Sequence, residues 1–326
     1  MTLLRVELER FRCRPVLWLV AGLLLLASAG FVAMAWSGTA PPSAAQVAEG
    51  TEAYEAAVVR FEGVKDRILE QCREDESAGA GPAGDCLASY APELRSYLPP
   101  PPWFPAEVGD ATTGLTLPIL LAALAMGVSF VTAEFGARTM STWLTFAPRR
   151  SRVFASKSAA AALGALPAAL AALGLAIGGI ALVFVVRGAA IEGDGAWSTP
   201  LSTVARLLPA AVVAALLGAG LAFAVRHAAA VAGIVVWWAL AVEFTLPQVV
   251  PRLAPATLGL NLRAWLEGGA TYSVTDCGPD PDVAGAELCH DVDRIVGSAQ
   301  GGLVLLLAAA AVLAIGALVF RRRAVT

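Results

Sequence analysis

Few side chains in this sequence have the types and spacing that catalysis requires. The two histidines, His227 and His290, belong to no His-Glu-x-x-His motif, and no two cysteines have the Cys-x-x-Cys spacing typical of metal sites. No Gly-x-x-x-x-Gly-Lys-Ser/Thr phosphate loop occurs, so the chain is not expected to hydrolyse ATP by that route. The sequence therefore predicts no catalytic residue, no metal site and no cofactor bound by this chain, and it gives no indication of nucleic-acid binding.

One arrangement of residues could still support an enzyme. Gly127-Val-Ser129 resembles the serine setting of intramembrane proteases, and His227 could lie at a similar depth in the membrane. A serine nucleophile needs a base oriented against it, however, and a small polar residue in a membrane helix more often serves helix packing. Helix packing is therefore the favoured interpretation of Ser129.

Glu243 is the acid that lies deepest within a long apolar stretch. At 1.5 Å per residue, its place in the stretch 228–246 puts it about 22 Å from the start of that helix. Carboxylates inside a membrane usually face a cavity or a partner. Two hypotheses follow: Glu243 belongs to a pathway or gate, or it is a structural carboxyl near the interface, neutral or paired with Arg206 or Arg252.

Four of the five cysteines fall in two regions between apolar stretches. Cys72 and Cys86 lie in the segment 37–112, and Cys277 and Cys289 lie in 247–301. Four cysteines allow three pairings, and pairing within each segment is the simplest. Each such disulfide would close a short loop and add about 3 kcal/mol in the chain-entropy model. We therefore predict the disulfides Cys72–Cys86 and Cys277–Cys289, with Cys13 free.

Composition indicates the elements that position these residues. The chain is 57% hydrophobic and only 15% charged, whereas soluble domains carry about 25% charged residues. A membrane-spanning helix needs about 20 apolar residues. Six stretches meet this requirement, so we predict an all-α integral membrane protein with six transmembrane helices at 16–36, 113–133, 158–186, 207–225, 228–246 and 302–320. A Gly-x-x-x-Gly motif, Gly174 and Gly178, permits close helix approach, and packing within the chain is favoured over a dimer interface.

The charges between the stretches predict the orientation. With the N-terminus inside, 13 Lys and Arg but only 3 acids lie on the inner side, and 10 basic residues and 22 acids lie outside. Lys and Arg concentrate in the cytoplasmic loops of membrane proteins. Both termini, including the basic tail 321–326, are therefore expected in the cytoplasm of a bacterial cell, with the protein in the cell membrane.

Three segments outside the spans show helical periodicity. Residues 1–15 carry Leu4, Leu8 and Phe11 at the spacing of an amphipathic helix lying on the inner membrane surface; the alternative is a charged flank that only sets the topology. Residues 43–76 and 86–98 favour a small helical extracellular cap within the segment 37–112. In the outer segment 247–301, Leu258 to Leu266 predict a short amphipathic helix; the remaining outer loop is 187–206.

The segment 134–157, between the second and third spans, is the most informative. Met140, Trp143, Leu144 and Ala147 share one helical face, and Glu134 precedes Arg138 by four residues, the favourable order for a helical ion pair. Pro148 ends the pattern, and Arg149, Arg150 and Arg152 follow. By periodicity and charge alone, this is either an interfacial helix with a basic anchor or a helix that docks on a partner.

This segment resembles a loop in the permease subunits of type-2 ATP-binding-cassette (ABC) exporters. That loop has an acid, a Gly and a Thr opening a short helix, a Leu-rich turn, and an Arg and a Lys entering the next span. The matching residues are Glu134, Gly136, Thr139, Leu144, Arg152 and Lys157. The adjacent Gly-Thr pair of the family is here interrupted, as Gly136-Ala-Arg-Thr139. The amphipathic N-terminus, the six spans and the outer helices also resemble the family, although the enlarged first outer loop does not.

The resemblance implies a function and partners. In the family this loop is the coupling helix, which docks in a groove of the ATPase, so the expected contact residues are Glu134, Arg138, Thr139, Trp143, Leu144, Phe146, Arg149, Arg150 and Arg152. Two separate ATPase subunits would bind ATP and Mg, and a second permease subunit, identical or related, would complete an exporter in membrane lipid. The apolar spans slightly favour a lipid or a hydrophobic compound as substrate. The alternative function is a non-transporting sensor or scaffold that binds ligands or partners through its disulfide-bonded cap.

Overall fold

The computed structural model describes residues 3–77, 83–137, 149–192, 196–279 and 287–322. Within these ranges the chain is mainly helical, and six helices are long and apolar enough to cross a membrane. They are α2 (Pro15–Gly38), α5 (Phe104–Gly136), α7 (Arg150–Arg187), α8 (Ser198–Val225), the run Ala228–Val249 that begins with α9 (Ala228–Trp238), and α12 (Ser298–Arg322). They coincide with the six predicted spans, most of them extending several residues further. The protein is thus a multi-pass membrane protein.

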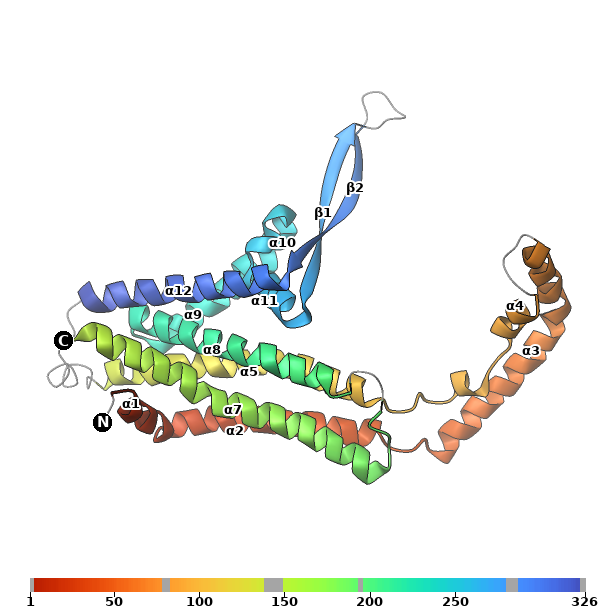
Figure 1. Cartoon of the computed structure of the whole chain (residues 1–326), viewed down its shortest axis with the longest axis horizontal. Helices are drawn as coiled ribbons and strands as arrows, with labels where there is room; N and C mark the ends of the chain where they lie inside the picture. Colours follow the sequence, from red (N-terminus) through yellow and green to blue (C-terminus); the bar gives the residue numbers. More distant parts are fainter. Residues whose placement is uncertain (1–2, 78–82, 138–148, 193–195, 280–286, 323–326) are drawn as a thin grey trace.

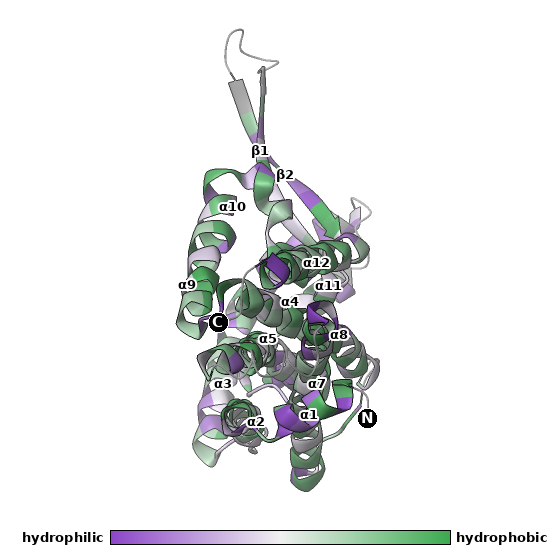
Figure 2. Cartoon of the chain, turned by 90° about the vertical axis from the view of Figure 1, so that its left-hand side faces the viewer, coloured by the Kyte–Doolittle hydropathy of each residue, from purple (hydrophilic) through white to green (hydrophobic). Residues whose placement is uncertain are grey.

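The long helices lie side by side in a bundle, with both chain ends at one end of it (Figure 1). The short helix α1 (Leu3–Arg12) lies at that end, which we call the α1 end. Viewed from there, the bundle helices are mostly hydrophobic, whereas α1 carries a group of hydrophilic residues (Figure 2). This distribution agrees with a lipid environment around the bundle.

Glycines allow the close approach of α5 and α8 at the centre of the bundle. A Cβ added at Gly127 of α5 would collide with the carbonyl oxygen of Ala215, and one added at Gly218 of α8 would collide with that of Leu124. Small residues allow membrane helices to pack this closely. The prediction that Gly174 and Gly178 pack within the chain is wrong, because a Cβ added at either would meet nothing within 4 Å.

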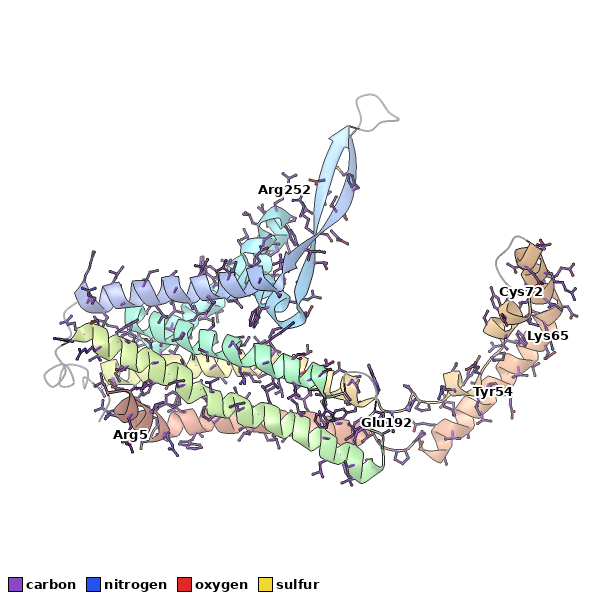
Figure 3. All side chains as sticks on the ribbon, viewed as in Figure 1. Arg5, Tyr54, Lys65, Cys72, Glu192 and Arg252 are labelled. Atoms are coloured by element: carbon purple, nitrogen blue, oxygen red, sulfur yellow. A yellow bond between two sulfur atoms is a disulfide. The ribbon has the colours of Figure 1, made fainter. Side chains whose placement is uncertain are left out.

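Between α2 and α5 the chain forms an arm that projects from the end of the bundle opposite α1 (Figure 1). The long helix α3 (Ala44–Ser77) is followed by α4 (Ala83–Tyr90) and the 3₁₀ turn η1 (Leu94–Tyr97). The disulfide Cys72–Cys86 joins α3 to α4, with Cα atoms 5.7 Å apart, near the tip of the arm (Figure 3). The two helices and the disulfide were predicted; the arm, however, extends away from the bundle instead of covering it.

The run that begins with α9 changes its helical type near its end. After α9 comes the π-helix η2 (Ala239–Thr245), and α10 (Leu246–Val249) and the 3₁₀ turn η3 (Pro251–Ala256) follow. Only 6% of the apolar stretch of this run is buried inside the protein, whereas 56% of the corresponding stretch of α8 is buried. This run is therefore the most exposed of the six spans.

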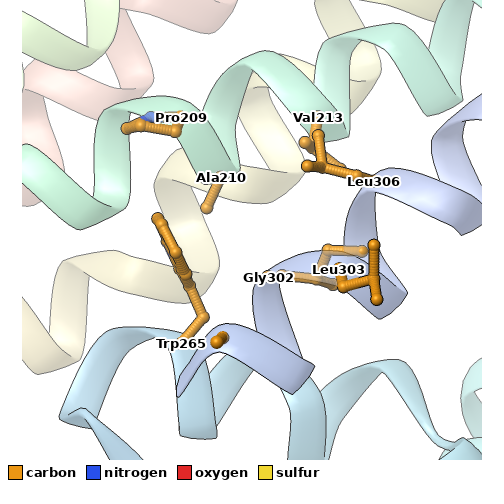
Figure 4. Close-up of a pocket in the computed structure, with 9 residues that line it drawn as sticks. Pro209, Ala210, Val213, Trp265, Gly302, Leu303 and Leu306 are labelled. Atoms are coloured by element: carbon orange, nitrogen blue, oxygen red, sulfur yellow. The ribbon is translucent and has the colours of Figure 1, made fainter.

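The predicted amphipathic helix is α11 (Leu258–Glu267), which packs on α12 and α8. Its Trp265 donates a hydrogen bond from Nε1 to the carbonyl oxygen of Arg206 (2.8 Å). The Trp265 ring also lines a crevice of about 290 Å³ between α8, α11 and α12 (Figure 4). Gly302 of α12 makes room for the ring, because an added Cβ would lie 2.7 Å from it.

A two-stranded antiparallel hairpin follows α11, and the sequence analysis did not predict it. Strand β1 (Gly269–Pro279) pairs with β2 (Glu287–Gly297), and Cys277 lies opposite Cys289, to which it is disulfide-bonded. Thr and Ser on β1 hydrogen-bond to aspartates on β2, for example Thr275 to Asp291 (2.7 Å). The hairpin projects away from the bundle beside α11 (Figure 1).

Candidate functional site

The amphipathic helix α1 packs on the bundle at the place where α5 ends and α7 begins. Its Phe11 is buried and lies 5.2 Å from the ring of Phe130 on α5. Gly164 of α7 makes room for Phe11, since an added Cβ would lie 2.7 Å from its ring. The predicted apolar face of the N-terminal segment is thus real, but it packs against other helices of the chain.

Where α1 meets the bundle lies a group of charges, which we call the Lys157 cluster: Glu7, Arg10, Arg14, Glu134 and Lys157. Its two carboxylates and Lys157 are buried, whereas the side chains of Arg10 and Arg14 are 41% and 21% exposed. Lys157, at 0% exposure, donates from Nζ to Oε2 of Glu7 (2.8 Å) and to Oε1 of Glu134 (2.6 Å). The Glu7 side chain is 0% exposed and that of Glu134 is 6% exposed. One ammonium therefore joins α1, the end of α5 and the first turns of α7.

Two arginines add further positive charge to the cluster. Arg10 and Arg14 each lie 3.6 Å from Oε1 of Glu134, and Arg14 also donates from Nη1 to the carbonyl oxygen of Ser129 (3.1 Å). Burial lowers the pKa of Arg14, and the nearby Glu134 and Glu7 oppose this shift. A guanidinium stays protonated in proteins. Three cations thus surround two carboxylates.

The ring of Phe130 packs against two cations of this cluster. Nζ of Lys157 lies 4.9 Å from the Phe130 ring centroid, and the Arg14 guanidinium lies 5.1 Å from it. Cations over ring faces are favoured most where water is excluded. The phenyl ring therefore contributes cation–π contacts to the cluster in addition to its ion pairs.

The geometry of the Lys157 cluster makes it a mechanical link. Charges taken out of water are stable only with good pairing geometry, and removing one partner costs about 3–5 kcal/mol. Glu134 and Lys157 stand on either side of the segment 137–149, and Glu7 belongs to α1. A displacement of one of these three elements must therefore move the other two or break a buried ion pair.

The other residues of the predicted coupling loop have varied places. Arg150 donates to the carbonyl oxygens of Phe320 (3.1 Å) and Arg321 (3.3 Å), where a cation is favourable at the C-terminus of α12. Arg149 and Arg152 are exposed. The remaining residues of the loop lie outside the described ranges: Arg138, Thr139, Trp143, Leu144 and Phe146. The proposed ion pair between Glu134 and Arg138 therefore stays a prediction.

Glu243 lies in the π-helix η2 and holds the start of α11. Its Oε1 accepts hydrogen bonds from Nε1 of Trp238 (2.8 Å) and the backbone N–H of Leu258 (2.9 Å), and its Oε2 accepts one from the N–H of Gly259 (2.7 Å). A carboxylate is favourable at a helix N-terminus.

The ion pair with Arg206 or Arg252, one of the alternatives considered for Glu243, is not among its contacts in the described part of the chain. Arg252 instead pairs with Asp276 (3.1 Å), and Arg206 donates to the carbonyl oxygen of Leu266 (3.0 Å). Glu243 is thus a hydrogen-bonded cap of α11. This contact holds whether the residue also belongs to a pathway or is only structural.

Ser129 and His227 form no hydrogen bond with each other in the described part of the chain. The carbonyl of Ser129 accepts from Arg14, and His227 precedes α9 in an extended conformation. The geometry thus gives no nucleophile oriented by a base.

Sequence reasoning missed Glu7, Arg10 and Arg14 as members of a site. One signal was available: Glu7 stands at i+3 from Leu4, before Leu8 and Phe11, and so interrupts the apolar face of α1. An acid on a buried face requires a cation opposite it. Which cation fulfils this role was not readable, because Lys157 lies 150 residues away.

Searches with this chain found no matching family model, no matching curated protein and no matching solved structure.

Proposed function

We propose that this chain is the permease subunit of a type-2 ABC exporter, powered by ATP that separate subunits hydrolyse. The observation that carries the proposal is the Lys157 cluster. Its ion pairs of 2.6 and 2.8 Å tie α1 to both ends of the segment 134–157, the segment whose sequence resembles the family's coupling loop. A protein moved by a partner at this segment needs such a connection.

Motion at the loop can pass into the bundle by two routes. The Lys157 cluster links the loop to α1, α5 and α7, and the hydrogen bonds of Arg150 link the start of α7 to the end of α12. From α5, the close contact at Gly127 continues to α8. Close-packed interiors transmit displacement because they have low compressibility. Four of the spans would therefore move in response to a push at one loop.

The proposal specifies the partners and the orientation. The α1 end lies in the cytoplasm, where two ATPase subunits dock and supply the ATP and Mg site. A second permease subunit completes the path across the cell membrane. No residue described in the bundle assigns a particular cargo, and the apolar spans agree with export of a lipid or another hydrophobic compound.

Co-purification with an ATPase subunit encoded beside this chain tests the proposal. We expect wild-type protein to retain the ATPase, and Trp143→Ala combined with Leu144→Ala to release it while insertion into the membrane is unchanged. Large aromatic residues at the centre of an interface commonly contribute about 2 kcal/mol or more. The matched control is Trp103→Ala, which alters an exposed tryptophan at the opposite end of α5 and should leave the complex intact.

Two results would contradict this assignment. If the double variant retains the ATPase with unchanged affinity and stimulated hydrolysis, the segment 134–157 is not the coupling element. If no ATPase co-purifies with the wild type, the sensor or scaffold hypothesis is favoured over the exporter. The projecting arm of α3 and α4 would then be the binding element.

A further inference from the structure

A crevice of about 580 Å³ lies between α9 and α12, and we call it the α9–α12 crevice. Side chains of α8 and α5 form its base, and η3 and α11 close one end. Its lining is apolar throughout: Leu124, Leu217, Leu221, Ile234, Val235, Trp238, Ala256, Leu258, Val304, Leu307, Ala308, Ala311 and Val312. Pockets of this size are typical of small-molecule sites.

Glu243 fixes the end of this crevice nearest α11. Two residues of that wall, Trp238 and Leu258, donate N–H groups to Oε1 of Glu243 (2.8 and 2.9 Å). The π-helix η2 places the carboxylate between them. Because these donors are already hydrogen-bonded, the wall offers an occupant only its ring and aliphatic surfaces. π-Helical turns often mark functional sites.

The surroundings of the crevice indicate what occupies it. Leu307 is 59% exposed and Ile234 is 40% exposed, so the crevice opens sideways between two membrane-spanning helices. At that depth the solvent is hydrocarbon. A cavity without polar partners does not hold water but does bind apolar molecules. A flexible hydrocarbon chain fits both the lining and the lateral opening.

We propose that the α9–α12 crevice binds the acyl chain of a membrane lipid, and that Glu243 is the positioning residue that holds its wall. This binding goes beyond the proposed transport function, because it requires neither nucleotide nor an ATPase subunit. A failure of ATPase co-purification would therefore leave it unaffected.

Photocrosslinking in vesicles tests the proposal. The purified full chain is reconstituted in phosphatidylcholine that includes a fraction with a diazirine in one acyl chain, irradiated, digested and mapped by mass spectrometry. We expect adducts to be enriched several-fold on 234–238 and 304–312 relative to the exposed face of α7 around Leu182 and Val185. Ala308→Phe should fill the crevice and lower the labelling of 234–238 several-fold. The matched control Ala171→Phe, at an exposed position of α7, should leave it unchanged.

A second variant tests the role of Glu243. Glu243→Gln keeps one acceptor oxygen, but its NH₂ group cannot accept the hydrogen bonds made by the oxygen it replaces, either those of Trp238 and Leu258 or that of Gly259. We expect lower labelling of the crevice with unchanged labelling of α7, in protein that elutes as the wild type does in size exclusion.

Three outcomes would overturn the proposal. The first is labelling of the crevice no stronger than that of α7, which indicates ordinary boundary lipid. The second is unchanged labelling in Ala308→Phe or, if that variant does not fold, in Ala311→Phe. The third comes from a separate measurement: a bifunctional thiol reagent joins two copies of the Cys13→Ser, Ala308→Cys protein, since a second copy would then be the occupant.

Discussion

Lys157→Met would leave the carboxylates of Glu7 and Glu134 buried without the ammonium that both contact. Removing one partner of a buried ion pair costs about 3–5 kcal/mol. Arg10 remains 4.0 Å from Glu7, and both Arg10 and Arg14 remain 3.6 Å from Glu134, so part of the negative charge stays compensated. We therefore expect a loss near the lower end of that range, about 3 kcal/mol.

The measurement is thermal unfolding of the purified protein in detergent, followed by the fraction that remains monodisperse after heating. A matched control lies on α3, where Lys65 pairs with Glu62 at 3.2 Å in an exposed position (Figure 3). Exposed ion pairs contribute at most about 1 kcal/mol. Lys65→Met should therefore shift the unfolding temperature much less than Lys157→Met does.

A double-mutant cycle separates electrostatics from packing. Glu7→Gln alone removes one ion pair of Lys157 but leaves the pair with Glu134, and adding it to Lys157→Met removes a buried carboxylate that has lost its closest cation. We expect the double variant to be more stable than the two single losses added together, since contacting residues couple by about 0.5–3 kcal/mol. Equal shifts for Lys157→Met and Lys65→Met, or strictly additive losses for Glu7→Gln and Lys157→Met, would refute the reasoning.

Further predictions concern helix packing and the thiols. Gly127→Ala should destabilise the protein by about 1–3 kcal/mol, because the new Cβ collides with a carbonyl of α8. Gly174→Ala should leave stability unchanged or slightly raised, and equal losses in thermal unfolding would contradict the packing described. An impermeant thiol reagent on intact cells should label no cysteine until a reductant is added, because Cys72 and Cys277 are in disulfides and the free Cys13 lies at the α1 end, which we propose is cytoplasmic. Labelling of Cys13 in intact cells would contradict the proposed orientation.

Much of the architecture was predictable because it depends on local properties. A helix crosses a membrane when about 20 consecutive residues are apolar, so the six spans follow from the sequence without knowledge of their neighbours. The helical periodicity of 43–76 and of Leu258 to Leu266 likewise predicted α3 and α11. The disulfides joined the cysteines closest in sequence, 14 and 12 residues apart, as the simplest pairing required.

The hairpin shows where pattern reading was incomplete. Residues 271–275 and 291–296 are rich in Val, Ile and Thr, and apolar and polar side chains alternate along much of both stretches. Gly and Pro at 278–281 separate the two stretches. These are strand and turn signals. The presence of a cysteine pair favoured the prediction of an irregular loop closed by a disulfide. A disulfide between facing residues is, however, equally compatible with a two-stranded hairpin.

What the sequence alone determined was which segments are helices and which lie in lipid, because length and hydrophobicity are properties of a segment itself. Only the tertiary structure decided which polar groups meet inside the bundle. The partners of Lys157 lie 150 and 23 residues from it in the sequence. The backbone donors to Glu243 lie 15 and 16 residues from it, on α11. Gly174 and Gly127 both lie among apolar and small residues of long helices. A Cβ added at Gly174 would meet no atom, whereas one added at Gly127 would collide with the backbone of α8. The physical reason is that a buried polar group or a small side chain acquires its role from what packs against it, and helix crossings decide that contact.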